Sequence, residues 1–220
     1  MIQSIAMHGK TTLMNRFREN INQYISLDNL DIPEDDSYQI WKKANSSMYE
    51  VLQFFVEANH FKDDFEYFHH VGYGLHVLAE SKKTKVQYSF LFDRLTYDFS
   101  IECYIHNANS IKNLSDKFLT DFFTASEEYK FEFVEKSFFG KEVKAKYADL
   151  FMTFKGNIFR MMRNYFIGTS ENGKVDELGN WEKSWSIDTP IETIFSEGPI
   201  VLKWFYKFNY QLWKAKKKLQ

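Results

Sequence analysis

The sequence predicts an all-α protein, a single helical bundle of about six to eight helices forming one domain over residues 1–220. Proline and glycine are scarce, and neither occurs between Gly74 and Gly140, which disfavours many short strands joined by tight turns. The composition is 44% hydrophobic and 19% aromatic, enough to bury a large core. We expect that core to lie within about 38–168.

The chain is expected to begin with two helices. The first covers about 11–26 and is followed by a loop, in which Ser37 can cap a second helix that runs to about His60. The next segment, 62–83, is ambiguous because it contains two glycines that would break any long helix.

The middle of the chain is expected to hold the central helix of the bundle. From Val86 to about His106 the residues are apolar around most of a helical circumference, which predicts a helix buried on several sides. A further helix is expected over about 107–123, whereas 126–138 fits either a helix or a strand.

The longest periodic segment runs from Lys141 to Ile167, and Gly168 is expected to end that helix. The polar stretch 170–188 contains turn signals and predicts a small hairpin or an ordered loop. A last helix is expected over about 199–217, with Pro199 in its first turn.

The charge balance argues against a global attraction to nucleic acid or to anionic membranes, because the formal net charge is −2 and the isoelectric point is near 6.3. The one basic patch is the terminal stretch 214–218, a solvated helix end or a nucleic-acid contact. A single cysteine, Cys103, suits a reducing compartment. No apolar run reaches the roughly 18 to 20 residues of a membrane span. We therefore expect a cytoplasmic protein that does not enter membranes.

Four histidines raise the question of a metal site. Two of them follow a glutamate by three residues, as in di-iron carboxylate bundles, but the two pairs would point to opposite sides of one helix. Hydrogen-bonded histidines are the favoured interpretation, although metal binding stays open for His60, His69, His70 and His76. No complete cofactor motif occurs, so no cofactor is expected.

One polar row interrupts the expected central helix at intervals of four residues. On a helix its members would lie on one face, each able to bridge to the next. The row is either a solvated edge or, if buried among aromatic residues, a polar cleft with shifted pKa values. Its members are Arg94, Asp98, Glu102 and His106.

The stretch 157–170, NIFRMMRNYFIGTS, divides its apolar residues between two helix faces. One face continues the core stripe, whereas the other carries Phe159 and Phe166 beside Arg163. A helix with two apolar faces should pack on both sides, against another helix of the chain or against a second subunit. We therefore expect an interface around Arg163, and a homodimer.

The same stretch resembles the HEPN superfamily of prokaryotic defence and toxin–antitoxin proteins, which are helical bundles that dimerise and cut RNA. Arg163 matches the family's arginine and Asn164 the polar residue that often follows it. The family's histidine is replaced by Gly168, and no histidine occurs after His106. The resemblance implies RNA contacts by Arg160, Arg163 and Asn164, with the ribonuclease chemistry lost or altered.

Three functions follow from these patterns. The first is a HEPN-like protein of defence or toxin–antitoxin type with a binding or regulatory role. The second is an enzyme, such as an endoribonuclease, in which His106, Glu102 and Arg163 are catalytic and Arg94 and Asp98 complete the site. The third is a helical module that binds a partner protein.

Overall fold

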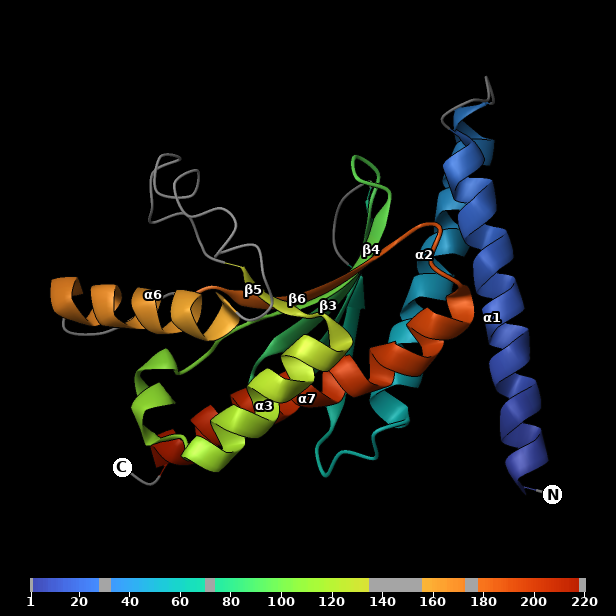
Figure 1. Ribbon diagram of the computed structural model, residues 1–220. Helices are drawn as coiled ribbons and strands as arrows, with labels where there is room; N and C mark the ends of the chain where they lie inside the picture. Colours follow the sequence, from blue (N-terminus) through green and yellow to red (C-terminus); the bar gives the residue numbers. More distant parts are fainter. Residues whose placement is uncertain (1, 28–32, 70–73, 135–155, 173–177, 218–220) are drawn as a thin grey trace.

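The computed structural model shows a mixed α/β fold, so the predicted all-α bundle is wrong. It describes residues 2–27, 33–69, 74–134, 156–172 and 178–217. Six strands form one antiparallel sheet in the order β1-β2-β3-β4-β6-β5. Helices α1, α2, α3 and α7 gather on one side of this sheet, and α6 extends from its β5 edge (Figure 1).

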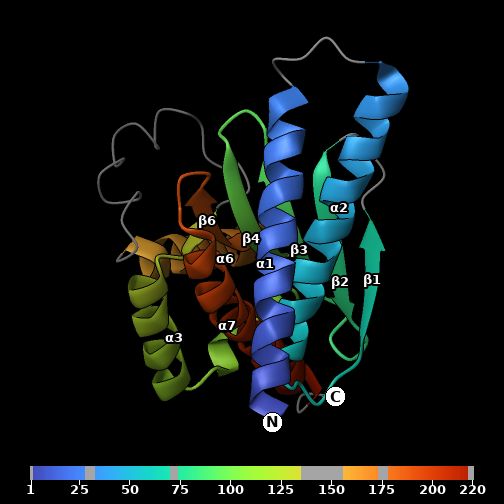
Figure 2. The ribbon, with the colours of Figure 1, turned by 90° about the vertical axis from the view of Figure 1, so that its right-hand side faces the viewer.

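The two expected N-terminal helices are present with different bounds. The first begins earlier than predicted, whereas the second begins before Ser37, which therefore lies inside the helix instead of capping it, and ends before His60. Helix α1 spans Ile2–Ser26 and α2 spans Glu34–Glu57. They run antiparallel side by side, and α2 packs on the sheet (Figure 2). Three acidic residues in the first turn of α2 interact favourably with the positive end of its helix dipole and so stabilise the helix.

The expected central helix over 86–106 is instead a pair of strands within a four-stranded meander. The strands are β1 (Phe65–His69), β2 (Leu75–Ser81), β3 (Gln87–Asp93) and β4 (Asp98–Tyr104). Every second residue of β3 and β4 is buried against the helices, as the two-residue period of a strand requires. Because side chains four residues apart share a face in a helix and in a strand alike, the pattern of this apolar-rich segment also fits a buried helix.

The β2–β3 and β3–β4 turns form without glycine. Lys85 and Tyr97 adopt positive φ angles of 59° and 57° in the β2–β3 and β3–β4 turns. Asp93 Oδ1 accepts a hydrogen bond of 2.8 Å from the Leu95 N–H and so stabilises the second turn. Scarcity of glycine and proline was therefore a misleading argument against strands.

The chain then passes through a short 3-10 helix, η2 (Ala108–Asn113), α3 (Asp116–Tyr129) and the short strand β5 (Glu132–Val134). Helix α6 covers Asn157–Asn172, so Gly168 lies inside the helix rather than ending it. The first part of the predicted helix, 141–155, lies outside the described residues. The predicted hairpin or loop near 170–188 contains β6 (Asn180–Ser186), which pairs with β4 and β5.

Helix α7 spans Ile191–Lys217 and crosses below the sheet beside α3 (Figure 1). It begins eight residues before Pro199, which lies inside the helix instead of in its first turn. Its buried face and the sheet enclose an aromatic core whose largest fully buried members include Tyr88, Phe122, Trp181, Phe205 and Phe208.

Gly198 sets how closely α7 approaches α2. A Cβ atom added there would lie 2.4 Å from the Phe55 ring, well inside van der Waals contact. We expect Gly198→Ala to lower the free energy of unfolding by about 1–3 kcal/mol in urea denaturation. Gly9→Ala is the matched control, because nothing lies within 4 Å of its added Cβ. Gly9 occupies an exposed helix position, so alanine there should stabilise the protein by about 0.5–1 kcal/mol. Equal effects of the two substitutions would contradict the close contact between Gly198 and Phe55.

None of the helices in the described part of the chain is both long enough and apolar enough to span a bilayer.

Candidate functional site

The sheet has one face turned away from α2 and α7, here called the outer face. Its side chains alternate with the buried ones along each strand. Seven of the strand positions on this face carry carboxylates and none carries lysine or arginine. The acidic positions are Glu66, Glu80, Asp93, Asp98, Glu102, Glu132 and Glu182.

Three of these carboxylates form one row across neighbouring strands. Glu102 of β4 lies opposite Glu182 of β6, which lies opposite Glu132 of β5. Like charges placed directly opposite each other destabilise a sheet, so the row costs folding energy. This cost indicates that the three carboxylates are not placed there to stabilise the fold.

Polar neighbours hold the row in place without neutralising its centre. Asn180 Nδ2 donates to Glu102 Oε2 at 3.2 Å, and Ser184 Oγ donates to Glu182 Oε1 at 2.9 Å. Only Glu132 meets a cation, because Arg160 Nη2 of α6 lies 3.6 Å from its Oε2. Among the described residues no lysine or arginine forms an ion pair with Glu102 or Glu182.

Burial and the neighbouring charges raise the pKa values of Glu102 and Glu132. Burial raises the pKa of Glu102, and the charge of Glu182 raises it further. Burial likewise raises the pKa of Glu132, although Arg160 opposes that shift. Glu102 and Glu132 therefore retain protons more strongly than isolated glutamates do.

Glu102→Gln is expected to stabilise the protein by about 0.5–1 kcal/mol at pH 7–8, since it removes a like-charge pair. Because the folded-state pKa of Glu102 is raised above 4.5, its ionisation subtracts stability as pH rises through that range. The gain should therefore shrink towards pH 4, where the native carboxyl is protonated. Thermal melts of both proteins over this pH range test the prediction, and a stabilisation that is independent of pH contradicts it.

The predicted polar row does not lie on a helix. Arg94 occupies the β3–β4 turn, Asp98 and Glu102 belong to β4, and His106 lies just after that strand. Asp98 and Glu102 still share the outer face, because four residues are also two strand periods. His106 is exposed, and its main-chain N–H donates to Asn209 Oδ1 of α7 at 3.0 Å.

Two of the residues expected to bind nucleic acid are buried and have structural contacts. Arg160 donates to Asn157 Oδ1 and faces Glu132, whereas Asn164 Nδ2 donates to the Leu178 carbonyl at 3.3 Å. Arg163 is half-buried on α6, one turn beyond Arg160. Of the expected catalytic residues, the structure thus places Glu102 on the outer face, while Arg163 belongs to the helix at its β5 edge.

The histidines are spread over separate elements. His69 of β1 stacks on Tyr49 with ring centroids 4.9 Å apart, and its Nδ1 lies 3.2 Å from Asn45 Nδ2. His60 follows α2, His76 belongs to β2 and His70 lies outside the described residues. Within the described residues no three histidine, cysteine or acidic side chains converge as a metal site would require.

No family model matches the chain, and comparison with curated proteins and with solved structures finds no significant similarity. The helical bundle implied by the HEPN resemblance is not the fold of this chain, and no comparison bears on the relationship itself.

Sequence reasoning missed Glu132 and Glu182 because they are 30 and 80 residues from Glu102 along the chain. Only strand register brings the three together. The available signal was local. Phe131 and Phe133 flank Glu132, and Trp181 and Trp185 lie two strand periods apart among polar residues, a partial two-residue period that Val134 and Lys183 interrupt.

Proposed function

We propose that the protein is a binding protein whose outer face docks a basic segment of a partner polypeptide. The observation that carries the proposal is the presence of seven carboxylates, and no basic side chain, at the strand positions of one sheet face. Complementary charge favours encounter with a positively charged partner and suppresses wrong ones.

The spread of the charges favours a polypeptide over a single ion. The carboxylates occur on all six strands, and the described residues contain no group arranged to hold a metal ion. Exposed apolar side chains lie between the charges, including Phe68 at 41% and Tyr104 at 48% exposure. A partner with several spaced cations and apolar side chains fits such a surface better than a compact ligand.

The proposal is tested with a peptide in which lysine alternates with threonine, and with a control peptide that replaces lysine by glutamate. We expect calorimetry to detect binding of the lysine peptide alone. The double change Glu102→Gln and Glu182→Gln should weaken its affinity about tenfold, equivalent to about 1.4 kcal/mol. The double change Glu127→Gln and Glu128→Gln removes two exposed charges from α3 and should leave it unchanged. If both double variants lost the same amount of affinity, the change in net charge alone would explain the effect, and the proposal would be rejected.

A second proposal concerns self-association through α6. Phe159 and Phe166 are 64% and 61% exposed and seven residues apart, so they lie on one side of the helix with Arg163 between them. Exposed aromatic residues on one helix face favour an interface with a second copy. Light scattering should give a dimer for the native protein and a monomer for Phe159→Asp. A monomer in both cases rejects the interface.

A further inference from the structure

A basic cleft lies at the end of the sheet where the β2–β3 turn meets α7. It has a volume of about 570 Å³ and is contributed by the segment after α2, the turn after β2 and the last turns of α7. Its lining residues are Lys62, Asp63, Asp64, Lys82, Lys83, Trp213 and Lys217. Of the described lysines in this cleft, the sequence had singled out Lys217 alone, as part of the terminal basic stretch.

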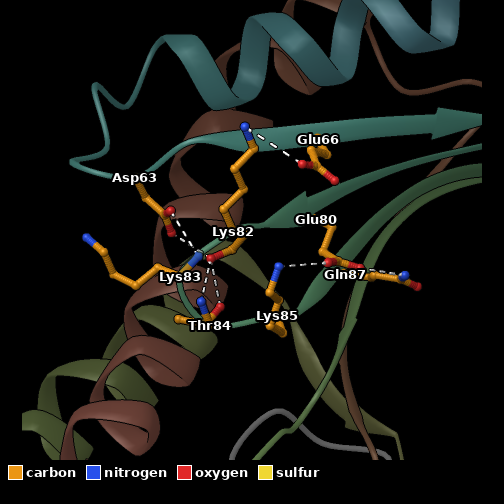
Figure 3. A network of polar contacts seen from close by, with 9 residues as sticks. Asp63, Glu66, Glu80, Lys82, Lys83, Thr84, Lys85 and Gln87 are labelled. Carbon is orange, nitrogen blue, oxygen red and sulfur yellow. Dashed lines mark hydrogen bonds and ion pairs between the residues drawn. The ribbon is translucent and has the colours of Figure 1, made fainter.

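One of the two aspartates of the cleft is committed to internal hydrogen bonds. Asp63 Oδ2 accepts from Ser81 Oγ at 2.5 Å and from the Tyr206 hydroxyl at 3.0 Å, while its Oδ1 accepts from the Lys83 N–H at 3.2 Å. Figure 3 shows Asp63 directed at the main chain of this turn. Its charge is therefore stabilised within the fold, and lysines dominate the rest of the cleft.

Lys82 is held loosely enough to take another anion. Lys82 Nζ lies 3.7 Å from Glu66 Oε1, an ion pair drawn in Figure 3, and both side chains are about half exposed. Exposed ion pairs of this kind contribute little to stability, so a phosphate can replace the carboxylate. Lys62 and Lys217 are exposed at the rim.

Aromatic rings continue from the core of the protein into this cleft. The Tyr206 and Tyr210 rings are stacked with centroids 5.8 Å apart, and Trp213 follows at 5.4 Å from Tyr210. Lys217 Nζ lies 4.2 Å from the Trp213 ring centroid and Lys83 Nζ 5.7 Å from that of Tyr210. Three rings thus follow one another along one side of α7, with Lys217 of the same helix over the last ring and Lys83 of the β2–β3 turn over the middle one.

We propose that this cleft binds a single-stranded nucleic acid, with the lysines contacting phosphates and Trp213 stacking on a base. Lysines that follow the backbone beside aromatic rings are the combination by which proteins hold single strands without reading sequence. The Trp213 ring beside the lysines offers a stacking surface for a base, a contact that attraction to a membrane surface does not require. The cleft is opposite in charge to the outer face, so the two surfaces select different partners.

The test is fluorescence anisotropy with labelled single-stranded DNA and RNA of about 15 nucleotides at salt concentrations between about 50 and 200 mM. We expect both strands to bind, with an affinity that falls as salt rises. The double change Lys62→Ala and Lys217→Ala should weaken binding at least tenfold. It should also make the salt slope less negative by about 1.4, because two phosphate contacts are lost. Trp213→Ala should weaken binding by about fivefold or more.

The matched control is the double change Lys42→Ala and Lys43→Ala, which removes two exposed lysines from α2. These residues lie about four turns before the end of that helix, far from the cleft. The control should leave affinity and salt slope unchanged. Binding that weakens equally in the control and cleft variants would overturn the proposal. So would native protein that binds anionic phospholipid vesicles but neither oligonucleotide. Tighter binding of RNA than DNA would identify the 2′-hydroxyl as an additional contact and support the site.

Discussion

Trp181→Ala is expected to lower the free energy of unfolding by about 3–5 kcal/mol. The Trp181 side chain of β6 is fully buried, and its ring lies within 4.8 Å of Phe122 and 5.5 Å of Phe208, measured between centroids. It also contacts Phe133 of β5 at 5.6 Å, so one side chain joins the sheet to α3 and α7. Removing it leaves a large cavity between rigid elements that cannot collapse to fill it.

Urea denaturation measures this loss, and Leu95→Ala provides the control because the Leu95 side chain is 94% exposed. The control should change stability by less than about 0.5 kcal/mol. A similarly small effect of Trp181→Ala would place residues 180–186 at the surface and would contradict the observed sheet.

Asn157→Leu is expected to destabilise the protein by about 2–4 kcal/mol, because it leaves buried main-chain N–H and C=O groups without a hydrogen-bond partner. Asn157 is fully buried at the start of α6. Its Oδ1 accepts from the Phe133 N–H at 2.8 Å, and its Nδ2 donates to the Phe131 carbonyl at 2.9 Å and to Ser126 Oγ at 3.3 Å. This amide therefore connects α6 to β5 and to the end of α3.

The comparison is with Asn164→Leu, one of the residues first expected to contact nucleic acid. Asn164 is also buried, but among the described residues it makes one hydrogen bond, of 3.3 Å to the Leu178 carbonyl, so its loss should cost about 1 kcal/mol. Thermal unfolding of both variants tests the difference. A larger loss for Asn164→Leu than for Asn157→Leu would contradict the assigned hydrogen bonds.

The helical part of the fold could be predicted because helix periodicity and capping are local. Helices α1, α2 and α3 and the second half of α7 were expected near their observed positions. The strands were missed at 86–106, where side chains spaced by four residues satisfy a helical turn and two strand periods equally. Positive φ angles at Lys85 and Tyr97 then made turns that glycine and proline content could not reveal.

The candidate site could be predicted only in fragments for the same reason. Glu102 was singled out, but its cross-strand neighbours depend on a register that a single sequence does not encode locally. Arg160 was expected to contact nucleic acid, whereas it supports Glu132 from α6. The basic cleft was equally hidden, since its lysines come from three distant segments.

The most direct test of the proposed function is a two-dimensional amide NMR spectrum recorded while the lysine–threonine peptide is added. Binding to the outer face predicts that the changing signals cluster on β4 and β6, around Ser100, Glu102 and Glu182, whereas those of α2 stay in place. High salt should reverse the changes. Signals that shift on the helical side, or shifts of similar size scattered over the whole protein, would contradict a docking surface on the outer face.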